Sequence, residues 1–474
     1  MKACKNLIIV VLAAGKGKRM LSHTPKVLHR ILDKPMIHYV LKEACKLNPS
    51  RVYVVTGFGH EELEKYLNEN FPMAIPVFQE EQLGTGHAVN MVRKYYDSDW
   101  DDVMVLPGDS PLIKSKTLEK LIDSQHDKNL SCSLLSSMIE DPYGYGRIVK
   151  NEKDEVIRIV EERDACDSEK KICEINSSIY CFKAAALFDY LKKLKTDNSQ
   201  NEFYLTDIIE EMIKDGHKAA ALKAEDALEA LGVNDRLALS GVTKIMQRRI
   251  NEELMKFSGV SMTDPESAYI GDEVVISRDV IIHPNTFIYG KSTIGSGCII
   301  GPSAQLYDCH IGKNTVINST VLIEAKLGEN NNIGPFTYVR PGTVTDDKVK
   351  IGGFCEVKKS KIGRSSKIPH LTYIGDTEIG QNVNIGASSV TCNYDSFRKN
   401  RTIIGNDVFI GSDTMLVPPV EIGNGAIVAA GSVITENVPE DALAIARSKQ
   451  VNIEGGAVKF RAKKEKEKNE GACK

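Results

Sequence analysis

Two groups of residues have the types and spacing needed for chemistry, and the first lies near the N-terminus. It is a run of small and basic residues after an apolar stretch, Leu12-Ala13-Ala14-Gly15-Lys16-Gly17-Lys18-Arg19-Met20. Small residues let backbone N–H groups approach an anion, and Lys16, Arg19 and Lys26 carry the positive charge that a polyphosphate needs. The run has neither Walker spacing nor the G-x-G-x-x-G pattern. Taken alone, it fits a basic turn between a strand and a helix equally well.

Two later segments suggest that this run is part of a larger site. Residues 79–87 (Gln-Glu-Glu-Gln-Leu-Gly-Thr-Gly-His) and 106–111 (Leu-Pro-Gly-Asp-Ser-Pro) fall at or just after apolar strands. Ligands collect at the carboxyl ends of strands in open α/β sheets. Asp109 is therefore placed to hold a hard divalent cation, and Asn234 offers a second oxygen. Both Mg²⁺ and Mn²⁺ satisfy such oxygen ligation.

The second group lies in the C-terminal half, where polar residues interrupt an aliphatic repeat. Its members are Arg340, Glu356, Lys358, His370 and Tyr373, spaced near one turn apart if three six-residue units make a turn. Acyl transfer to an amine needs a base, and an imidazole accepts a proton near neutral pH. The carboxylate of Glu356 could orient the His370 ring or favour its charged form. A lone histidine on a repeat surface more often has no catalytic role, but His370 has polar neighbours.

The repeat breaks at residues 392–401, a segment long enough to leave the coil as a loop. Inserted loops on solenoids often lie over a functional face. Tyr394 or backbone N–H groups could donate hydrogen bonds to a tetrahedral oxyanion. Lys399, with Arg340 and Lys358, carries charge suited to a sugar phosphate. A β-helix that serves only as a spacer or an oligomerisation rod is the alternative.

The elements that must position the first group alternate between strands and helices. The pattern predicts a mostly parallel sheet with helices on both faces. The expected strands are 7–12, 51–56 and 103–106, and the expected helices are 36–47, 61–69 and 115–124. A further helix is expected over 235–257, where apolar residues recur at helical spacing.

The second group must stand on a parallel β-helix, because a strict six-residue aliphatic period begins near residue 269. The strands of a β-sandwich would not hold phase for so long. The aliphatic positions are Ile270, Ile276, Ile282, Ile288, Ile294, Ile300 and Leu306, then Ile311, Ile317 and Ile323, and finally Ile404, Ile410, Leu416, Ile422, Val428 and Ile434. Beyond the repeat, residues 459–474 are basic and almost free of apolar side chains, so a disordered tail is expected.

Composition excludes several classes of protein. Lys and Arg number 61 and Asp and Glu 64, so a formal net charge of -3 leaves no global field for nucleic acid or an anionic membrane. The eleven cysteines are scattered without C-x-x-C spacing, which favours a reduced cytoplasm over secretion. The apolar start at residues 7–14 is too short to span a bilayer.

The run L-A-A-G-x-G-x-R-M with its downstream lysine resembles sugar-1-phosphate nucleotidyltransferases. Nearly the whole chain is similar to the bifunctional family that is both UDP-N-acetylglucosamine pyrophosphorylase and glucosamine-1-phosphate N-acetyltransferase. The resemblance implies a homotrimeric left-handed β-helix, with UTP and acetyl-CoA as co-substrates and Mg²⁺ as the metal. The implied organisation is a uridylyltransferase domain over 1–236, a linker helix over 237–257, an acetyltransferase domain over 258–458 and the tail over 459–474.

The resemblance also implies roles for residues of the N-terminal domain. Lys26 and Arg19 would be the catalytic cations, and Asp109 and Asn234 would ligate the metal. UTP would contact Leu12, Ala13, Ala14, Gly15, Lys26, Gln79, Gly84 and Thr85. The N-acetylglucosamine moiety would contact Gly146, Glu161, Asn176 and Asn234.

In the C-terminal domain the resemblance implies that His370 is the base and Glu356 its partner. Glucosamine-1-phosphate would contact Arg340, Lys358, Tyr373, Asn384 and Lys399. Acetyl-CoA or the oxyanion would contact Asn393, Tyr394, Ser412, Ala430 and Arg447.

The sequence departs from the family pattern at Pro107, where an aromatic or small polar residue is common, and at Pro369, where a small residue is commoner. The alternative function is a nucleotidyltransferase for another sugar or nucleotide, with a structural or regulatory β-helix. A non-enzymatic scaffold is a third reading, which leaves Lys26, Asp109 and Asn234 unexplained.

Overall fold

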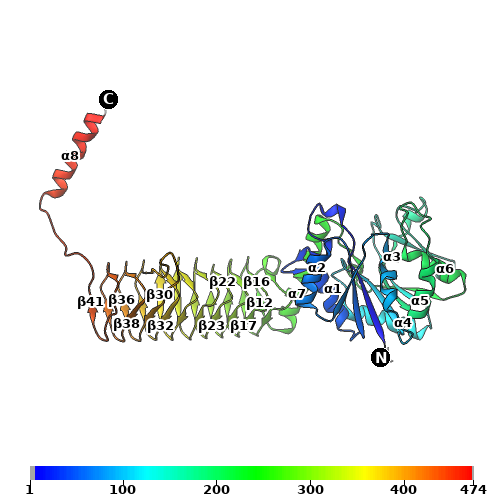
Figure 1. Ribbon diagram of the computed structural model, residues 1–474, viewed down its shortest axis with the longest axis horizontal. Coiled ribbons are helices and arrows are strands. Elements are labelled where there is room, and N and C mark those ends of the chain that lie inside the picture. The colour runs from blue at the N-terminus through cyan, green and yellow to red at the C-terminus, as the bar shows by residue number, and fades with distance from the viewer. Residues whose placement is uncertain (1–5, 472–474) are drawn as a thin grey trace. The chain divides into compact units, whose positions relative to one another are not determined.

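The computed structural model describes residues 6–471, and the last three residues of the expected tail lie outside this range. The chain divides into two compact units, Met1–Glu252 and Glu253–Lys474. A sheet with helices makes up most of the first unit, and short strands stacked in coils make up most of the second (Figure 1).

The N-terminal unit is built on one twisted sheet with the strand order β11-β7-β10-β6-β1-β4-β5. Strands β5, β4, β1 and β6 run parallel, whereas β10 is antiparallel to both β6 and β7. The main strands are β1 (Leu7–Leu12), β4 (Arg51–Thr56), β5 (Ala74–Phe78), β6 (Asp102–Pro107), β7 (Cys132–Met138), β10 (Glu174–Lys183) and β11 (Ala219–Lys223). Two more pairs are β8 (Gly146–Lys150) with β9 (Val156–Val160), and β2 (Arg30–Ile31) with β3 (Lys34–Pro35).

Helices cover both faces of this sheet (Figure 1). They are α1 (Met36–Cys45), α2 (His60–Asn70), α3 (Thr85–Asn90), α4 (Ser115–Asp127), α5 (Ala184–Tyr190) and α6 (Leu205–Lys214). Short 3-10 turns are η1 (Lys18–Met20), η2 (Lys26–Leu28), η3 (Met91–Tyr95), η4 (Glu169–Lys171), η5 (Leu191–Lys193) and η6 (Ala227–Ala230).

The alternation of side chains along β1 explains why helices are needed on both faces. Ile8 and Val10 belong to a buried cluster with residues of α3, α5 and α6. Leu7, Ile9 and Val11 belong to another with residues of α1, α2 and α4. Successive residues of a strand point to opposite faces of the sheet, so a strand that is apolar at every position needs helices packed on both faces. The predicted sheet class is confirmed.

Helix α7 (Arg236–Phe257) forms where the apolar spacing predicts a helix. Val242 and Met246, on its first half, are buried in a cluster that includes Leu112 and Val233. The division between the two units falls within this helix.

The C-terminal unit is a parallel β-helix whose short strands stack into three sheets (Figure 1). The first sheet contains β12 (Ser261–Met262), β15 (Ile281–Ile282), β18 (Ile299–Ile300), β21 (Val316–Ile317), β24 (Asn332–Ile333), β27 (Lys350–Gly353), β30 (Lys367–His370), β33 (Asn384–Ile385), β36 (Phe409–Ile410), β39 (Ile427–Val428) and β41 (Leu443–Ala444). The second contains β13 (Tyr269–Ile270), β16 (Phe287–Tyr289), β19 (Gln305–Tyr307), β22 (Val321–Ile323), β25 (Tyr338–Val339), β28 (Glu356–Lys358), β31 (Tyr373–Gly375), β34 (Val390–Thr391), β37 (Met415–Leu416) and β40 (Val433–Ile434).

The third sheet closes each coil. It contains β14 (Val275–Ile276), β17 (Thr293–Ile294), β20 (His310–Ile311), β23 (Lys326–Leu327), β26 (Val344–Thr345), β29 (Lys361–Ile362), β32 (Thr377–Ile379), β35 (Thr402–Ile404) and β38 (Val420–Ile422). A short turn, η7 (Pro265–Ser267), precedes the first coil of this repeat.

The aliphatic repeat supplies the core of the β-helix, as predicted, with one exception. Ile288, Leu306 and Leu322 lie in register on adjacent coils and are fully buried. Ile323 was the predicted core residue, but it is only partly buried. The spacing from Ile317 to the next buried aliphatic residue is five residues rather than six, so the inward aliphatic position shifts to Leu322.

Ile-Gly pairs recur along the repeat, for example at 311–312 and 362–363, and they have a steric cause. A Cβ added at Gly312 would lie 2.5 Å from the backbone of Gly328 on the next coil, and one at Gly363 would lie 2.5 Å from the Gly380 carbonyl oxygen. Neighbouring coils thus approach too closely at these positions for any side chain.

The end of the chain differs from the prediction, because α8 (Gly456–Gly471) is a helix rather than a disordered tail. Lys463 and Lys464 lie within ion-pair distance of Glu467 at helical spacing. The segment consists largely of Lys, Glu and Ala, which favour helix without an apolar face. No helix among residues 6–471 is long and apolar enough to cross a membrane.

The adjacent residues Ile281 and Ile282 test the inward and outward alternation. Ile282 is 1% exposed and Ile281 is 39% exposed. We expect Ile282→Ala to lower the free energy of unfolding by about 2–5 kcal/mol because it leaves a cavity. The matched Ile281→Ala variant should change it by about 0.5 kcal/mol. Denaturant unfolding followed by circular dichroism measures both, and equal losses would contradict the assigned core.

Candidate active sites

Three predicted residues from distant parts of the sequence meet at the edge of the N-terminal sheet. The Lys26 Nζ atom donates hydrogen bonds to Asp109 Oδ2 and, at 2.7 Å, to Asn234 Oδ1. The side chains of Lys26 and Asp109 are largely shielded from solvent. A shielded ion pair of this kind is electrostatically stronger than an exposed one. The predicted convergence of the three residues is therefore observed.

Strand order explains how the three residues come together. Leu12 and Pro107 are register partners at the carboxyl ends of β1 and β6. The Gly108 N–H donates to the Leu12 carbonyl oxygen at 2.9 Å, which places Asp109 directly beyond the sheet. The Val233 N–H then donates to the Asp109 carbonyl oxygen at 2.9 Å, which brings Asn234 to the same edge.

The basic loop is shaped by Gly17, which has a φ of 59°. A Cβ at Gly17 would lie 2.7 Å from the Cβ of Lys26. Glycine is thus required both for the left-handed backbone and for the close approach of the lysine. Arg19 follows in η1 and is exposed.

The donor set fits a hard divalent cation only in part. Asp109 and Asn234 each place an oxygen against the same ammonium group, so both oxygens face one position. Mg²⁺ is commonly held by one or two protein oxygens, with substrate phosphates and water completing its ligands. Among residues 6–471 there is no cluster of three or more His, Cys, Asp or Glu that would form an all-protein metal site.

The segment expected to hold uracil lies at the start of α3. Gln79 is buried, and its side-chain amide lies 2.8 Å from His87 Nδ1 and 3.5 Å from the Gly84 carbonyl oxygen. Thr85 Oγ1 accepts a hydrogen bond from the Leu205 N–H at 3.0 Å. Gln79 and Gly84 are therefore joined by a hydrogen bond, whereas Thr85, the next residue in the chain, is bonded to Leu205.

Three of the four residues expected to hold the sugar, Gly146, Glu161 and Asn176, also lie together. Gly146 is the register partner of Asn176. A Cβ at Gly146 would lie 3.4 Å from a carboxylate oxygen of Glu161. Burial raises the pKa of Glu161, and a hydrogen bond from the Thr206 hydroxyl acts in the opposite direction.

Tyr145 belongs near the first site although the sequence did not single it out. Burial raises the pKa of Tyr145, a hydrogen bond with the Gly232 backbone lowers it, and the charge of Asp109 raises it. The phenol therefore lies within electrostatic range of Asp109 and Arg19. Its position beside Gly146 in Tyr143-Gly144-Tyr145-Gly146 was the one available signal.

In the C-terminal unit, Glu356 pairs with Arg340 rather than with His370. The Arg340 guanidinium lies 2.7 Å from Glu356 Oε1. Among the described residues no hydrogen bond joins Glu356 to His370, which ends β30 on a different sheet. The direct contact expected between this carboxylate and the imidazole is therefore absent from the structure.

His370 shares a column of the β-helix with two predicted acetyl-CoA residues. Successive strands β30, β33, β36 and β39 are parallel and in register. This register places His370, Ser412 and Ala430 at equivalent outward positions on their coils. Arg447 joins them, because its guanidinium donates to the Ala430 carbonyl oxygen at 2.8 Å.

Tyr373 and Asn393 meet over Gly375 on the second sheet. The Asn393 amide donates to Asp376 Oδ2 at 2.6 Å and to the Tyr373 hydroxyl at 3.5 Å. A Cβ at Gly375 would lie 2.5 Å from both the Tyr373 hydroxyl and the Asn393 amide nitrogen. Asp376 was not predicted, and no motif marks it. Lys358 is the register partner of Gly375.

The inserted loop is a small hairpin that holds its own shape. Tyr394 and Lys399 form an antiparallel bridge, and the Lys399 ammonium lies 4.0 Å from the centre of the Tyr394 ring. The Tyr394 hydroxyl donates to the Ser396 carbonyl oxygen at 2.8 Å. Bonds from the Arg398 N–H, the Asn400 amide and the Phe397 N–H lower the pKa of Asp395 to about 2.

Asn384 lies on the first sheet, where it is the register partner of Lys367 and Phe409. It is therefore on the same sheet as His370, not on the sheet that carries Tyr373. The predicted sugar-phosphate residues thus occupy two adjacent faces of the β-helix.

A family model matches part of each half of the chain. The nucleotidyl transferase family model matches residues 8–237. The bacterial transferase hexapeptide model, with six repeats, matches residues 273–307 and 401–436. A UDP-glucose pyrophosphorylase solved with UDP-glucose is 19% identical, with a TM-score of 0.43 over 52% of this chain and 99% of its own.

Relatives align with nearly the whole chain. The bifunctional protein GlmU of Carboxydothermus hydrogenoformans is 47% identical over 94% of this chain and 98% of its own length. Those of Caldanaerobacter subterraneus and Halalkalibacterium halodurans are 47% and 43% identical over 95% of this chain, covering 97% and 98% of their own. The β-helix is of the left-handed hexapeptide type. The chain therefore belongs to the GlmU family of bifunctional proteins, with a nucleotidyl transferase domain followed by a hexapeptide transferase domain.

Proposed function

We propose that the N-terminal unit transfers a uridylyl group from UTP to N-acetylglucosamine-1-phosphate, forming UDP-N-acetylglucosamine and pyrophosphate. The observation that carries this proposal is the meeting of Lys26, Asp109 and Asn234 at one sheet edge. The network around Gln79 supports a base pocket, and the grouping of Gly146, Glu161 and Asn176 supports a sugar pocket beside it.

The chemistry needs no covalent residue. A phosphate oxygen of the sugar attacks the α-phosphorus of UTP, and pyrophosphate leaves on the opposite side. Two anions must be aligned against their repulsion, so binding and charge neutralisation supply the catalysis. Lys26 and Arg19 carry positive charge at the phosphates. Mg²⁺, held by Asp109 and Asn234, would supply a further positive charge at the transferring phosphoryl group.

Asp109 provides the first test of this proposal. We expect Asp109→Ala to lower uridylyl transfer by at least the roughly 100-fold that loss of a metal ligand's outer partner can cost, because the metal here loses its one carboxylate ligand from the protein. Pyrophosphate release measures the loss, and acetyl transfer by the same preparation is the control, expected within about twofold of the unaltered protein. Removal of Mg²⁺ with a chelator should have the same selective effect. Normal turnover of Asp109→Ala in saturating Mg²⁺ would contradict the assignment.

We propose that the C-terminal unit transfers the acetyl group of acetyl-CoA to glucosamine-1-phosphate, before the uridylyl step. The amine attacks the thioester carbonyl, His370 accepts the proton from the nitrogen, and the thiolate of coenzyme A leaves. Arg340, Lys358, Tyr373, Asn384 and Lys399 would hold the sugar phosphate. The column of His370, Ser412 and Ala430 supports a path for acetyl-CoA along the coils.

The proposal gives Glu356 a different part from the expected one. Because it pairs with Arg340, we infer that it orients that guanidinium for the sugar phosphate rather than the ring of His370. Oxyanion stabilisation falls to backbone N–H groups or to Tyr394, whose hydroxyl would first have to leave Ser396.

His370 provides the test of the second activity. We expect His370→Ala to lower release of free thiol from acetyl-CoA by about 100-fold or more, because general-base catalysis is lost. Uridylyl transfer should be unchanged. His310→Ala, which removes another exposed histidine of the β-helix, is the matched control and should release thiol normally. If the β-helix has no catalytic function, even the unaltered protein will release no thiol from acetyl-CoA.

We propose that the β-helix associates as a homotrimer. Phe336, Phe354 and Leu371 occupy equivalent corners of successive coils and are 61%, 65% and 57% exposed. The two phenylalanine rings stack with centroids 5.4 Å apart. An exposed apolar ridge of this kind is typical of a surface that another protein covers, and cyclic symmetry closes such contacts between copies.

The ridge gives a test of the trimer. We expect the double variant Phe336→Glu, Phe354→Glu to sediment as a monomer, because charge replaces the apolar contact. If the acetyl site is shared between subunits, the monomer loses thiol release by about 100-fold, because the groups of the site are no longer positioned together, and it keeps uridylyl transfer. Met73→Glu changes an exposed apolar residue outside the β-helix and should remain trimeric. An active monomer in the thiol assay would contradict a shared site.

We propose a cytoplasmic location. Cys45, Cys132, Cys166 and Cys181 are among the cysteines that are free thiols in the described part of the chain. Thiols persist in a reducing compartment, whereas secretion favours disulfides.

A further inference from the structure

We propose that Arg249 of α7 is a positioning residue for the metal-binding edge of the nucleotidyl transferase unit. It joins the segment that follows Asp109 to the segment that leads to Asn234. The inference rests on the proposed uridylyl transfer. It gives this arginine the role of fixing the distance between the two metal ligands.

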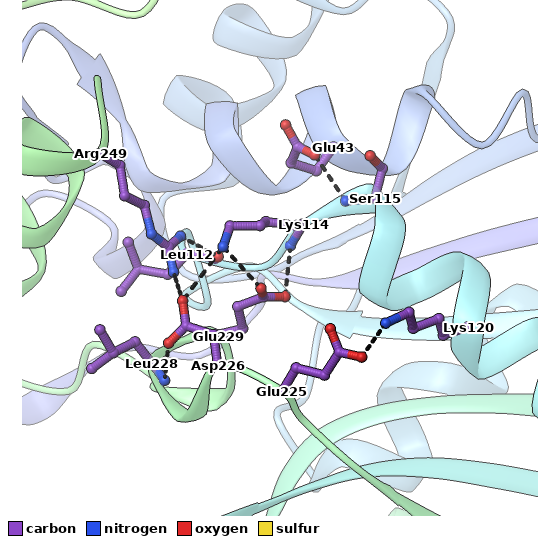
Figure 2. A network of polar contacts seen from close by, with 10 residues as sticks. All are labelled: Glu43, Leu112, Lys114, Ser115, Lys120, Glu225, Asp226, Leu228, Glu229 and Arg249. Carbon is purple, nitrogen blue, oxygen red and sulfur yellow. Dashed lines mark hydrogen bonds and ion pairs between the residues drawn. The ribbon is translucent and has the colours of Figure 1, made fainter. Parts of the chain in front are cut away.

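Figure 2 shows the guanidinium of Arg249 lying between these two segments. One nitrogen donates to the Leu112 carbonyl oxygen at 2.7 Å, and another lies 2.7 Å from Asp226 Oδ2. Burial acts to raise the pKa of Asp226, but the Leu228 N–H and the charge of Arg249 outweigh it and leave the pKa below its usual value. Arg249 thus holds a backbone oxygen and a carboxylate at the same time, in the fixed geometry of a planar, forked donor.

A second pair strengthens the same junction. The Lys114 ammonium lies 3.2 Å from Glu229 Oε1 and 3.4 Å from Asp226 Oδ2. The Lys114 N–H donates to Glu229 Oε2 at 3.3 Å. Glu229 is buried, so its charge depends on these partners. Figure 2 shows both carboxylates facing Lys114, and Asp226 also facing Arg249.

The junction is close to the metal ligands along the chain. Leu112 comes three residues after Asp109, and η6 (Ala227–Ala230) ends four residues before Asn234. The two segments are also joined by the bond from the Val233 N–H to the Asp109 carbonyl oxygen. Val233 and Leu112 are buried together with residues of α7. A shift at Arg249 would therefore change the separation of Asp109 and Asn234.

Outer partners of metal ligands commonly change metal affinity or activity by about 10–100-fold when they are removed. Arg249 acts on the metal ligands indirectly, through the backbone segments that carry them, so we expect an effect at the lower end of this range. The effect should appear as weaker metal binding rather than as loss of the fold, because Asp109 and Asn234 remain present.

The experiment compares Arg249→Gln and Arg249→Lys in the full-length protein. Lys120→Gln is the matched control, because Lys120 pairs with Glu225 beside Asp226 but at an exposed site. Binding of Mn²⁺ to the protein–UTP complex is followed by water proton relaxation, against a blank of UTP alone. The Mg²⁺ concentration for half-maximal pyrophosphate release and the rate of thiol release are measured on the same preparations.

We expect Arg249→Gln to raise the Mn²⁺ dissociation constant and the Mg²⁺ midpoint about tenfold. Arg249→Lys should give a smaller shift, because an ammonium keeps the charge without the fork. Thiol release should stay within about twofold in every variant, and Lys120→Gln should match the unaltered protein.

An unchanged Mn²⁺ dissociation constant and Mg²⁺ midpoint in Arg249→Gln would overturn the inference. So would an equal loss of both activities in both Arg249 variants, because that pattern assigns the arginine to folding alone. If the unaltered protein releases no pyrophosphate, the proposed function fails, while the Mn²⁺ comparison still tests the role of Arg249.

Discussion

The contact of Lys26 with Asp109 and Asn234 is the interaction on which the N-terminal unit depends. Asp109 and Asn234 lie 83 and 208 positions after Lys26 in the sequence, so the contact joins three distant segments of the chain. A charged group shielded from water is stable only beside its partners. The sheet order that places β1 beside β6, the turn at Gly17 and the return of the chain at Val233 all serve to keep these partners together.

The C-terminal unit is organised by a different constraint, the register of its coils. One buried residue per strand fixes the position of the next coil, so the outward residues on either side of it also align. His370, Ser412 and Ala430 therefore share a column although 60 positions separate the first from the last. No hydrogen bond among their side chains is needed to align them, because the backbone ladder does so.

The sequence predicted what depends on periodicity, together with the meeting of Lys26, Asp109 and Asn234, but missed several other pairs of side-chain partners. Alternation and the aliphatic repeat were enough to predict the sheet, α7 and the β-helix. The shortened step that buries Leu322 in place of Ile323 was not predicted, because a phase slip has no fixed position in an aliphatic run. The pairing of Glu356 with Arg340 and the bond from Asn393 to Asp376 join residues 16 and 17 positions apart, where spacing alone allows several partners.

The close approach of successive coils at Gly312 and Gly363 has a consequence for how this molecule can change. Each coil contacts only the coils before and after it, as in other solenoids. The proposed acetyl transfer residues lie between Arg340 and Arg447, so the coils before Tyr338 carry none of them. A whole coil added or removed well before Phe336 would therefore change the length of the β-helix without altering the contacts of its second catalytic surface or of the exposed apolar ridge.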